Sequence, residues 1–186
     1  MRADLAKPED IGPLMEVAIS HFGRLDILVN NAAIYKVGML EAITPQRFDE
    51  HFHLNVRGPM LAAQAASRVM ADGGVVVNIS SGVAKSPFPI VHVYASTKGA
   101  IDTFTRSLAL ELAPRQIRVV GIAPGYVFTE GNSETPKEMV DALVARTPLG
   151  RAGQPNDIAN AVAGAVSADF GWVTGTTIDV AGGLVI

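Results

Sequence analysis

The chain has 186 residues, 48% of them hydrophobic, a formal net charge of −3 and no cysteine. This length and composition allow one domain, residues 1–186, with a sizeable core, and they exclude disulfides and thiolate metal sites. The sequence has no basic block for nucleic acid, no apolar run near the ~18 residues of a membrane span and no apolar signal-peptide core, so we expect a soluble, cytoplasmic protein.

The first expected elements are a helix and a strand. A helical pattern covers residues 11–22, with Asp10 as its cap and Gly23 at its end. The run LDILVN at 25–30 lies between a glycine turn and a polar pair. Such a short apolar run is typical of a buried parallel strand.

The middle of the chain repeats this order. Thr44 and Pro45 suit the cap and first position of a second helix, and a helical pattern resumes over 55–70. The run GGVVVNIS at 73–80 predicts the next strand, which is entered through two glycines. A loop with two prolines then leads to an amphipathic helix over 93–112.

The last part of the chain adds two strands and two helices. IRVVGIAP predicts a strand at 117–124, and an irregular loop separates it from a short helix at 137–146. Pro155 and Asp157 suit the first turn of a helix that extends to about residue 168. TTIDVAGG predicts the final strand at 176–183.

Strands and helices alternate throughout, which predicts a Rossmann-like, doubly wound α/β fold: a parallel sheet with helices on both faces. Ligands of such sheets bind at the carboxyl ends of the strands. These ends are rich in polar or small residues here: Asn30 to Ala33, Ser80 to Gly82, Pro124 to Tyr126 and Ala181 to Gly183. We therefore expect one site shared by the four strand ends.

Tyr94 and Lys98 are four residues apart near the start of the helix at 93–112, so they share one face of it. A phenol with a pKa near 10 needs that pKa lowered by roughly 2–3 units to act as an acid or base near neutral pH. An ammonium ~4 Å away at an effective dielectric constant of ~20 supplies about 4 kcal/mol, which is enough. Taken alone, a surface pair without a chemical role is the commoner explanation.

Other motifs favour a chemical role. The segments LVNNAAI, LNVRGP, VVVNISS, YASTK, VVGIAPGYVFT, TPLGRAGQPNDIANAV and VTGTTIDVAGG follow one another over nearly the whole chain. In this order and spacing they resemble the short-chain dehydrogenase/reductase family, with its Tyr-x-x-x-Lys and Asn-Asn-Ala-Gly motifs. The resemblance implies an oxidoreductase that uses NAD or NADP to interconvert a secondary alcohol and a ketone.

The resemblance also implies four catalytic residues. Tyr94 would exchange a proton with the substrate oxygen, and Ser81 would hydrogen-bond the same oxygen and stabilise its charge. Lys98 would lower the tyrosine pKa and bind the nicotinamide ribose. Asn55 would hold a water that links Lys98 to solvent. Helix capping for Asn55 and loop capping for Ser81 are the alternatives; Ser80 is a rival for the catalytic serine, but the spacing to Tyr94 favours Ser81.

Cofactor contacts at the adenosine end are implied in two segments. Asn31, Ala32 and Ala33 would lie beside the adenosine ribose, although the family usually has glycine where this chain has Ala33. Asp4 and Leu5 resemble the aspartate-hydrophobe pair that meets the adenine in the family.

The nicotinamide end of the cofactor is implied to lie against the loop after the strand at 117–124. Pro124 and Gly125 would border it, Val127 would offer its backbone N–H to the carboxamide, and Thr129 its hydroxyl. A simple Pro-Gly turn after a strand explains the first two residues nearly as well.

One part of the family pattern is missing from these 186 residues: the strand, glycine-rich turn, helix and second strand that precede the first matching motif. Because one βαβ unit needs about 30 residues, we expect on the order of sixty to be absent. Their absence would weaken cofactor binding, since the turn and its helix hold the pyrophosphate, and would expose the edge of the strand at 25–30. The strand end that selects NAD or NADP is among them.

The expected substrate is a small molecule such as a 3-oxoacyl thioester, a sugar or a simple ketone, with Tyr126 and Phe128 either lining its pocket or only packing in a loop. The alternative is a catalytically impaired remnant that acts as a scaffold or a nucleotide-sensing regulator. The family suggests a homo-oligomer, a dimer or tetramer. The lack of a basic block and of a long apolar run predicts that it binds neither nucleic acid nor a membrane. His51 and His53 are expected on solvated helix surfaces, without a metal site.

Overall fold

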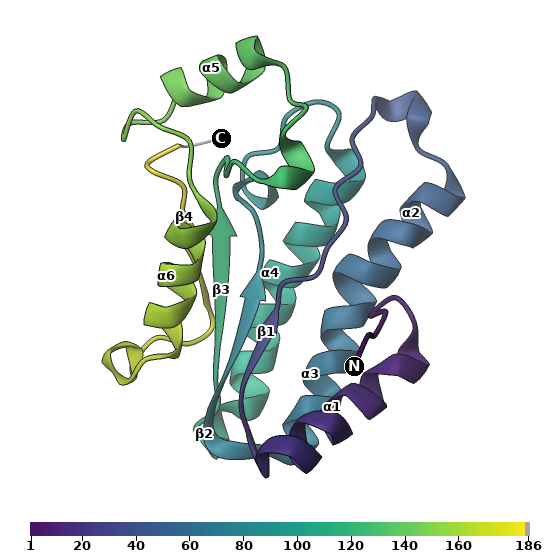
Figure 1. The fold of residues 1–186 in the computed structure, drawn as a ribbon, viewed down its shortest axis with the longest axis vertical. Helices are drawn as coiled ribbons and strands as arrows, with labels where there is room; N and C mark the ends of the chain where they lie inside the picture. Colours follow the sequence, from purple (N-terminus) through teal and green to yellow (C-terminus); the bar gives the residue numbers. More distant parts are fainter. Residues whose placement is uncertain (185–186) are drawn as a thin grey trace.

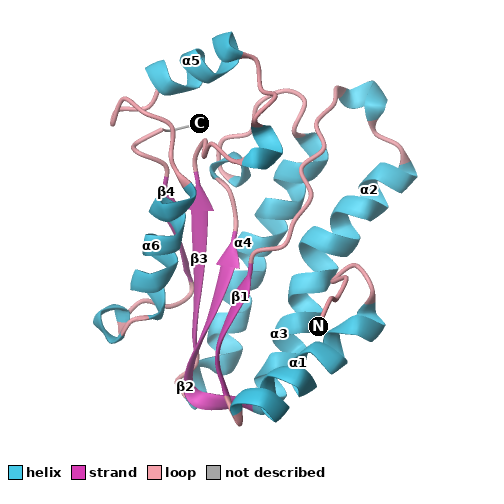
Figure 2. Ribbon diagram, in the orientation of Figure 1, coloured by secondary structure: helices cyan, strands magenta, loops and turns pink. Residues whose placement is uncertain are grey.

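The computed structural model of the protein describes residues 1–184, and its centre is a four-stranded parallel sheet (Figures 1 and 2). The strands lie side by side in chain order. Their bounds are β1 Leu25–Asn30, β2 Met70–Ile79, β3 Arg118–Pro124 and β4 Thr176–Val180. This arrangement confirms the predicted Rossmann-like architecture.

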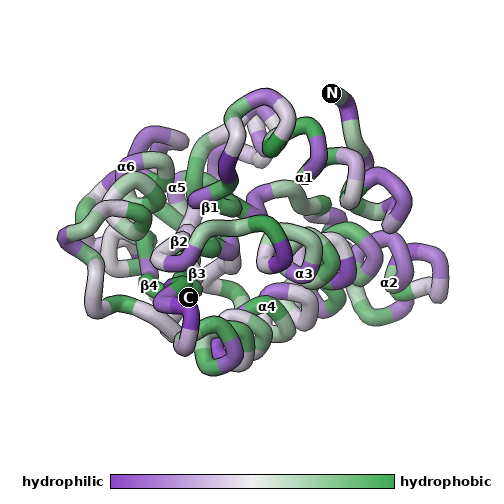
Figure 3. The backbone as a smooth tube through the Cα atoms, turned by 90° about the horizontal axis from the view of Figure 1, so that it is seen from below, coloured by the Kyte–Doolittle hydropathy of each residue, from purple (hydrophilic) through white to green (hydrophobic). Residues whose placement is uncertain are grey.

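Helices cover both faces of the sheet. Their bounds are α1 Pro8–Phe22, α2 Pro45–Phe52, α3 Gly58–Val69, α4 His92–Leu112, α5 Lys137–Ala145 and α6 Pro155–Val166. Side chains of a strand alternate between its faces, so Val76 and Val119 pack with α1, α3 and α4, whereas Val77 and Val120 pack with α6. Figure 3, seen from below, shows the hydrophobic strands between these helices.

The first helix differs from the prediction at its start. α1 begins at Pro8 rather than after Asp10, because proline is pre-set for the first helical position. Asp10 is inside the helix, and its carboxylate accepts a hydrogen bond from the backbone N–H of Asp4 at 2.8 Å. The helix ends as predicted at Gly23, which has a φ of 75°.

The second and third helices form one continuous rod, because a π-helical turn, His53–Arg57, joins α2 to α3. The backbone N–H of Gly58 reaches the carbonyl of His53, five residues back. Thr44 caps α2 and Pro45 opens it, as predicted. π-turns are rare overall, but those that occur are often found at functional sites. This one contains Asn55.

The strand ends are shaped by glycine. β4 stops at Val180, three residues before the predicted end, because Gly182 and Gly183 have positive φ values of 61° and 83° and turn the chain. β2 starts at Met70 rather than at the predicted residue 73, and the register of its pairing with β1 shifts near Leu25.

β1 forms an edge of the sheet, as expected. On the face that α6 covers elsewhere, Ile27 and Val29 are 44% and 41% exposed. Their exposure follows from the position of α6, which contacts the other three strands. Across residues 1–184, every helix is too short or too polar to cross a membrane.

Candidate active site

Residues from two segments meet where β2 ends. Ser81 directly follows β2, and Tyr94 and Lys98 lie one turn apart in the first turns of α4. The Lys98 ammonium is 5.5 Å from the centre of the Tyr94 ring and donates a hydrogen bond to the carbonyl of Ile79 at 2.7 Å. The three predicted side chains therefore share one environment.

The acid–base properties of this pair differ from the prediction that Lys98 lowers the tyrosine pKa. Burial raises the pKa of Tyr94 to about 12; a hydrogen bond with Ser81 opposes this rise, and Tyr35 adds to it. Burial likewise lowers the pKa of Lys98 to about 8, against the influence of Asp102. The prediction is wrong for this structure because the lysine is aimed at a strand carbonyl and both groups are buried.

The two candidate serines have different surroundings. The hydroxyl of Ser81 accepts the N–H of Val83 at 3.4 Å, and Ser81 acts on the phenol of Tyr94 by opposing the rise in its pKa. Ser80 is buried, and its hydroxyl points to the carbonyl of Lys98 at 3.4 Å, which ties the strand end to α4. Only Ser81 is placed to meet an oxygen that also contacts Tyr94.

Asn55 holds a loop. Its Oδ1 accepts the N–H of Ile34 at 2.8 Å, and its Nδ2 donates to the carbonyl of Ile34 at 2.9 Å and to the hydroxyl of Thr97 at 3.3 Å. Both amide hydrogens are thus used by the protein. A bridging water next to Asn55 would have to bond other atoms of this turn, so that part of its expected role stays a prediction.

His51 contradicts the expectation of a solvated histidine. It is fully buried. Its Nδ1 lies 2.7 Å from the carbonyl of Arg47, and its Nε2 accepts the N–H of Lys36 at 3.2 Å, so the proton is on Nδ1. The helical periodicity of α2 turns this position inward, toward the loop after β1.

Asn55 and His51 bond the backbone on either side of Tyr35. The Tyr35 ring consequently lies edge-on against the ring of Tyr94, with centres 4.8 Å apart and an interplanar angle of 84°. Sequence reasoning missed this second phenol, because nothing in an irregular loop shows which of its side chains turns toward a helix far along the chain.

The segments expected at the adenosine end lie beside the end of β1. Asn31, Ala32 and Ala33 follow that strand and are exposed. Leu5 packs tightly against α3: a Cβ added to Gly58 would be 2.8 Å from the Leu5 carbonyl oxygen. The Asp4 carboxylate accepts the N–H of Ala6 at 2.9 Å and so shapes its own turn.

The loop after β3 is held in place by neighbouring backbone. A glycine is favoured at position 125, since a Cβ added there would lie 2.8 Å from the Cβ of Ala181. Gly153 donates to the carbonyl of Tyr126 and accepts from the N–H of Phe128, both at 2.9 Å. In this parallel bridge the N–H of Val127 points away from Gly153 and has no hydrogen-bond acceptor within residues 1–184, so it can meet a ligand.

A side-chain bracket also shapes this loop, and sequence reasoning missed it. The Asn132 amide donates to the carbonyl of Val127 at 2.7 Å, and its oxygen accepts the N–H of Thr129 at 2.8 Å. Asparagine is well suited to such a bracket because it carries a donor and an acceptor on one planar group.

This arrangement fits a nucleotide at the strand ends. The ammonium of Lys98 has three donors and gives one to Ile79, which leaves two for sugar hydroxyls. The exposed alanines after β1 leave room for a flat group, and the Val127 N–H suits a carboxamide oxygen. In the part of the chain that the structure describes, no cluster of three or more His, Asp or Glu side chains could hold a metal ion.

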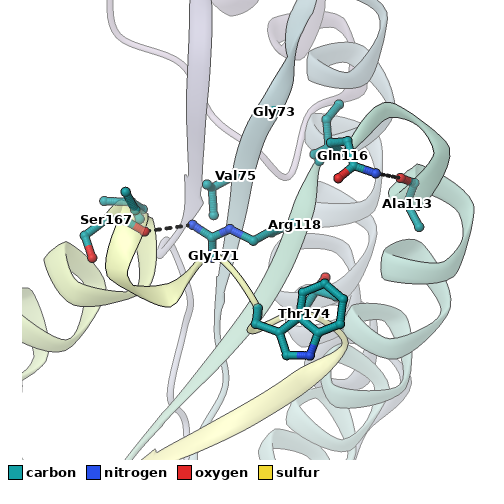
Figure 4. A pocket seen from close by; sticks show the side chains of 12 residues that line it. Gly73, Val75, Ala113, Gln116, Arg118, Ser167, Gly171 and Thr174 are labelled. Carbon is teal, nitrogen blue, oxygen red and sulfur yellow. Dashed lines mark hydrogen bonds between the residues drawn. The ribbon is translucent and has the colours of Figure 1, made fainter.

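A cavity of about 800 Å³ lies at the opposite ends of the strands (Figure 4). Its central side chain, Arg118, donates to the carbonyls of Ala165 and Ser167 at 2.8 and 3.2 Å and closes the end of α6. Trp172 at its rim is fully exposed. No residue predicted for the site lines this cavity, so we assign Arg118 a structural role.

Comparisons with known proteins agree with this geometry. A family model described as enoyl-(acyl carrier protein) reductase matches residues 1–185. An uncharacterised oxidoreductase of Methylorubrum extorquens is 46% identical over 187 residues, which cover 99% of this chain and 75% of the relative. The chain thus spans about three-quarters of that relative's length.

Solved structures are similarly close. A short-chain dehydrogenase/reductase from Serratia marcescens matches with a TM-score of 0.95 and 36% identity, over 100% of this chain and 76% of that one. A 3-ketoacyl-(acyl-carrier-protein) reductase from Brucella melitensis, complexed with NADH, gives 0.91 and 36%, over 99% and 77%. A blue fluorescent protein from a metagenomic library, in complex with NADPH, gives 0.93 and 36%, over 99% and 74%.

Proposed function

The chain belongs to the short-chain dehydrogenase/reductase family of NAD(P)-dependent oxidoreductases, and from this premise we propose that it interconverts a ketone and a secondary alcohol with Tyr94 as the proton donor and acceptor. The observation that carries the proposal is the convergence of Ser81, Tyr94 and Lys98 at the end of β2.

The protonated phenol of Tyr94 is suited to the direction of ketone reduction. With a pKa of about 12, Tyr94 is protonated at neutral pH and holds the proton that a reduced carbonyl oxygen must receive. A nicotinamide bound at the strand ends would supply the hydride. In the direction of alcohol oxidation the same phenol oxygen would accept the proton, which is harder at this pKa.

Ser81 would share the substrate oxygen with Tyr94. Ser81 is the side chain that opposes the rise in the pKa of Tyr94, so an oxygen atom placed between the two hydroxyls would meet two donors. Two donors aimed at one developing negative charge stabilise the transition state more than the neutral carbonyl, which is the basis of electrostatic catalysis.

Lys98 would orient the sugar next to the nicotinamide through its two remaining donors. Asn31, Ala32, Ala33, Asp4 and Leu5 would contact the adenosine end, and Pro124, Gly125, Val127 and Thr129 the nicotinamide end. The structures complexed with NADH and with NADPH support a nicotinamide nucleotide without separating NAD from NADP for this chain.

The substrate would enter beside Tyr35, Tyr126 and Phe128. The ketoacyl reductase similarity favours a 3-oxoacyl thioester among the three candidate classes. Phe128 is exposed, while the hydroxyl of Tyr126 is buried and has no hydrogen-bond partner among residues 1–184.

Assembly as a dimer or tetramer is part of the same proposal. Leu110 on α4 is 80% exposed, and the exposed ring of Phe48 on α2 stacks on Phe52 with centres 4.3 Å apart. Apolar helix surfaces of this kind favour contact with a second copy. Sedimentation velocity over a range of concentrations measures the mass of the particle.

The test is a titration of the protein with NADH and NADPH, followed by nicotinamide fluorescence and then by oxidation of the nucleotide in the presence of a 3-oxoacyl thioester, a keto sugar and a simple ketone. Binding with turnover of one ketone supports the proposal. Binding without turnover of any ketone would favour a nucleotide-sensing regulator, and the absence of binding would contradict both.

A further inference from the structure

Asp102 is a buried carboxylate that the proposed reaction does not use. It lies on α4, one turn after Lys98, and is 6% exposed. Its hydrogen-bond partner in residues 1–184 is the hydroxyl of Thr177 on β4, which donates to Oδ1 at 2.9 Å. One neutral hydroxyl does not replace the water that an ionised carboxylate loses on burial, so a compensating charge is expected nearby.

Lys98 carries that charge. It is 3% exposed, and in the part of the chain that the structure describes its ammonium has one acceptor, the carbonyl of Ile79. Residues four apart lie on one helix face, which places Asp102 and Lys98 in the same low-dielectric layer between α4 and the sheet. Asp102 also acts against the burial that lowers the pKa of Lys98 to about 8.

The other charged groups around this layer are exposed or bond other partners. Arg106, one turn after Asp102, is exposed and donates to Thr103. Lys85 after β2 and Asp179 on β4 pair with each other at 2.6 Å. Arg57, in the π-turn, donates to a backbone carbonyl at 2.6 Å, and Tyr94 is a neutral phenol at ordinary pH.

The sheet is built to hold the carboxylate in place. The side chain of Thr177 lies directly over Gly121 of β3, where a Cβ would overlap the threonine hydroxyl. A glycine at this position lets Thr177 sit deep enough to donate to Asp102. Three elements, α4, β3 and β4, therefore contribute to the position of one carboxylate.

We propose that Asp102 is a positioning residue of the active site: its carboxylate, fixed by Thr177, keeps the buried side chain of Lys98 a charged ammonium aimed at the end of β2. The proposal rests on the proposed function for its catalytic consequence only. An ammonium offers three donors to its surroundings and a neutral amine two weaker ones, so loss of the charge would weaken the hold on ligand hydroxyl groups.

The charge on Lys98 can be measured without any enzymatic assay. Protein labelled with ¹³C at lysine Cε is titrated by NMR between neutral and alkaline pH, and the Lys98 signal is identified by its loss in Lys98→Arg. We expect Asp102→Asn to move the titration midpoint of Lys98 to lower pH by about two units, the size expected for a charge a helix turn away at an effective dielectric constant of ~20.

Asp179→Asn is the matched control, because it removes a carboxylate from the same end of the sheet that is paired with Lys85. It should shift the Lys85 signal and leave that of Lys98 in place. If Asp102→Asn does not fold, Thr177→Val releases the carboxylate without removing it and should move Lys98 in the same direction by a smaller amount. An unchanged Lys98 midpoint in a folded variant would overturn the proposal.

The alkaline limb of the pH profile of kcat/KM should move with the NMR midpoint in Asp102→Asn. If the midpoint moves but no protein, including the unsubstituted one, reduces a ketone, the proposed function fails while the role of Asp102 stands. If activity is present and the profile moves without any change in the Lys98 titration, the role of Asp102 as described here is wrong.

Discussion

The ammonium of Lys98 stands 5.5 Å from the centre of the Tyr94 ring, yet its hydrogen bond goes to the strand carbonyl of Ile79 and not to the phenol. The lysine therefore lies beside the ring of the tyrosine without bonding its hydroxyl. Within one helix turn the two side chains thus differ: Tyr94 is protonated at neutral pH, and in residues 1–184 the ammonium of Lys98 bonds the carbonyl of Ile79.

Tyr94→Phe tests the proton donor. Phenylalanine preserves the edge-on ring contact with Tyr35 but has no proton to transfer, so ketone reduction should fall by about 10²–10⁴-fold, the usual contribution of general acid catalysis. Steady-state turnover and nucleotide fluorescence measure the two properties separately, and nucleotide affinity should stay the same. A variant that kept most of its turnover would show that another group delivers the proton.

Stability should depend on alkaline pH in two opposite ways. The pKa of Lys98 is lowered from 10.5 to about 8 on folding, so its contribution is complete above pH 10.5 and is lost as the pH falls through 8. The pKa of Tyr94 is raised from 10.0 to about 12, so its contribution is complete below pH 10 and is lost as the pH rises through 12. Each of these two contributions to the free energy of unfolding is on the order of 3 kcal/mol.

Urea unfolding at a series of pH values measures these two effects. Lys98→Met should flatten the rise in unfolding free energy between pH 8 and pH 10.5, and Tyr94→Phe should flatten the fall between pH 10 and pH 12. Curves of both variants parallel to that of the unsubstituted protein would mean that neither group is as buried as the structure places it.

Asn55→Ala should destabilise the protein by about 2–3 kcal/mol, because it leaves the N–H and the carbonyl of Ile34 without partners in a partly buried place. The unfolding free energy from urea denaturation gives this value. Asn160→Ala, on the exposed side of α6, is the matched control and should change stability little or improve it, since alanine favours helix. Equal effects of the two substitutions would contradict the loop-holding role.

Asn132→Ala should weaken nucleotide binding by about 10-fold, through the loss of two hydrogen bonds that shape the loop at Val127 and Thr129. The dissociation constant of NADH or NADPH, from nicotinamide fluorescence, is the measurement. Ser133→Ala removes a neighbouring side chain that, among residues 1–184, bonds only the carbonyl of Glu130, and it should leave affinity intact. An unchanged affinity in Asn132→Ala would mean that this loop does not contact the nucleotide.

Gly125→Ala should destabilise the protein by about 1–3 kcal/mol, because the new methyl group would lie 2.8 Å from the Cβ of Ala181. Thermal or urea unfolding measures the loss. Gly12→Ala is the control: it meets no atom within 4 Å inside α1 and should stabilise the protein by about 0.5–1 kcal/mol. Equal stability of Gly125→Ala and the unsubstituted protein would show that β3 and the chain after β4 separate easily.

The elements of the fold were predictable because they depend on local sequence. The apolar run of β1 has its predicted bounds, and the caps at Gly23 and Thr44 are observed as expected. Apolar periodicity, prolines and glycines act within a few residues, so they can be interpreted without a structure. Errors are confined to boundaries, where Pro8 lengthens α1 and positive-φ glycines shorten β4.

The site was predictable in part. By itself, the sequence determined that Ser81, Tyr94 and Lys98 belong to the ends of a strand and a helix that meet in a parallel sheet. Only the tertiary structure decided that His51 is buried, that Tyr35 contacts Tyr94, and that burial raises the tyrosine pKa. Desolvation and long-range contact are properties of the packed molecule, because they depend on which distant segments exclude water from a group, and no local pattern of residues encodes that.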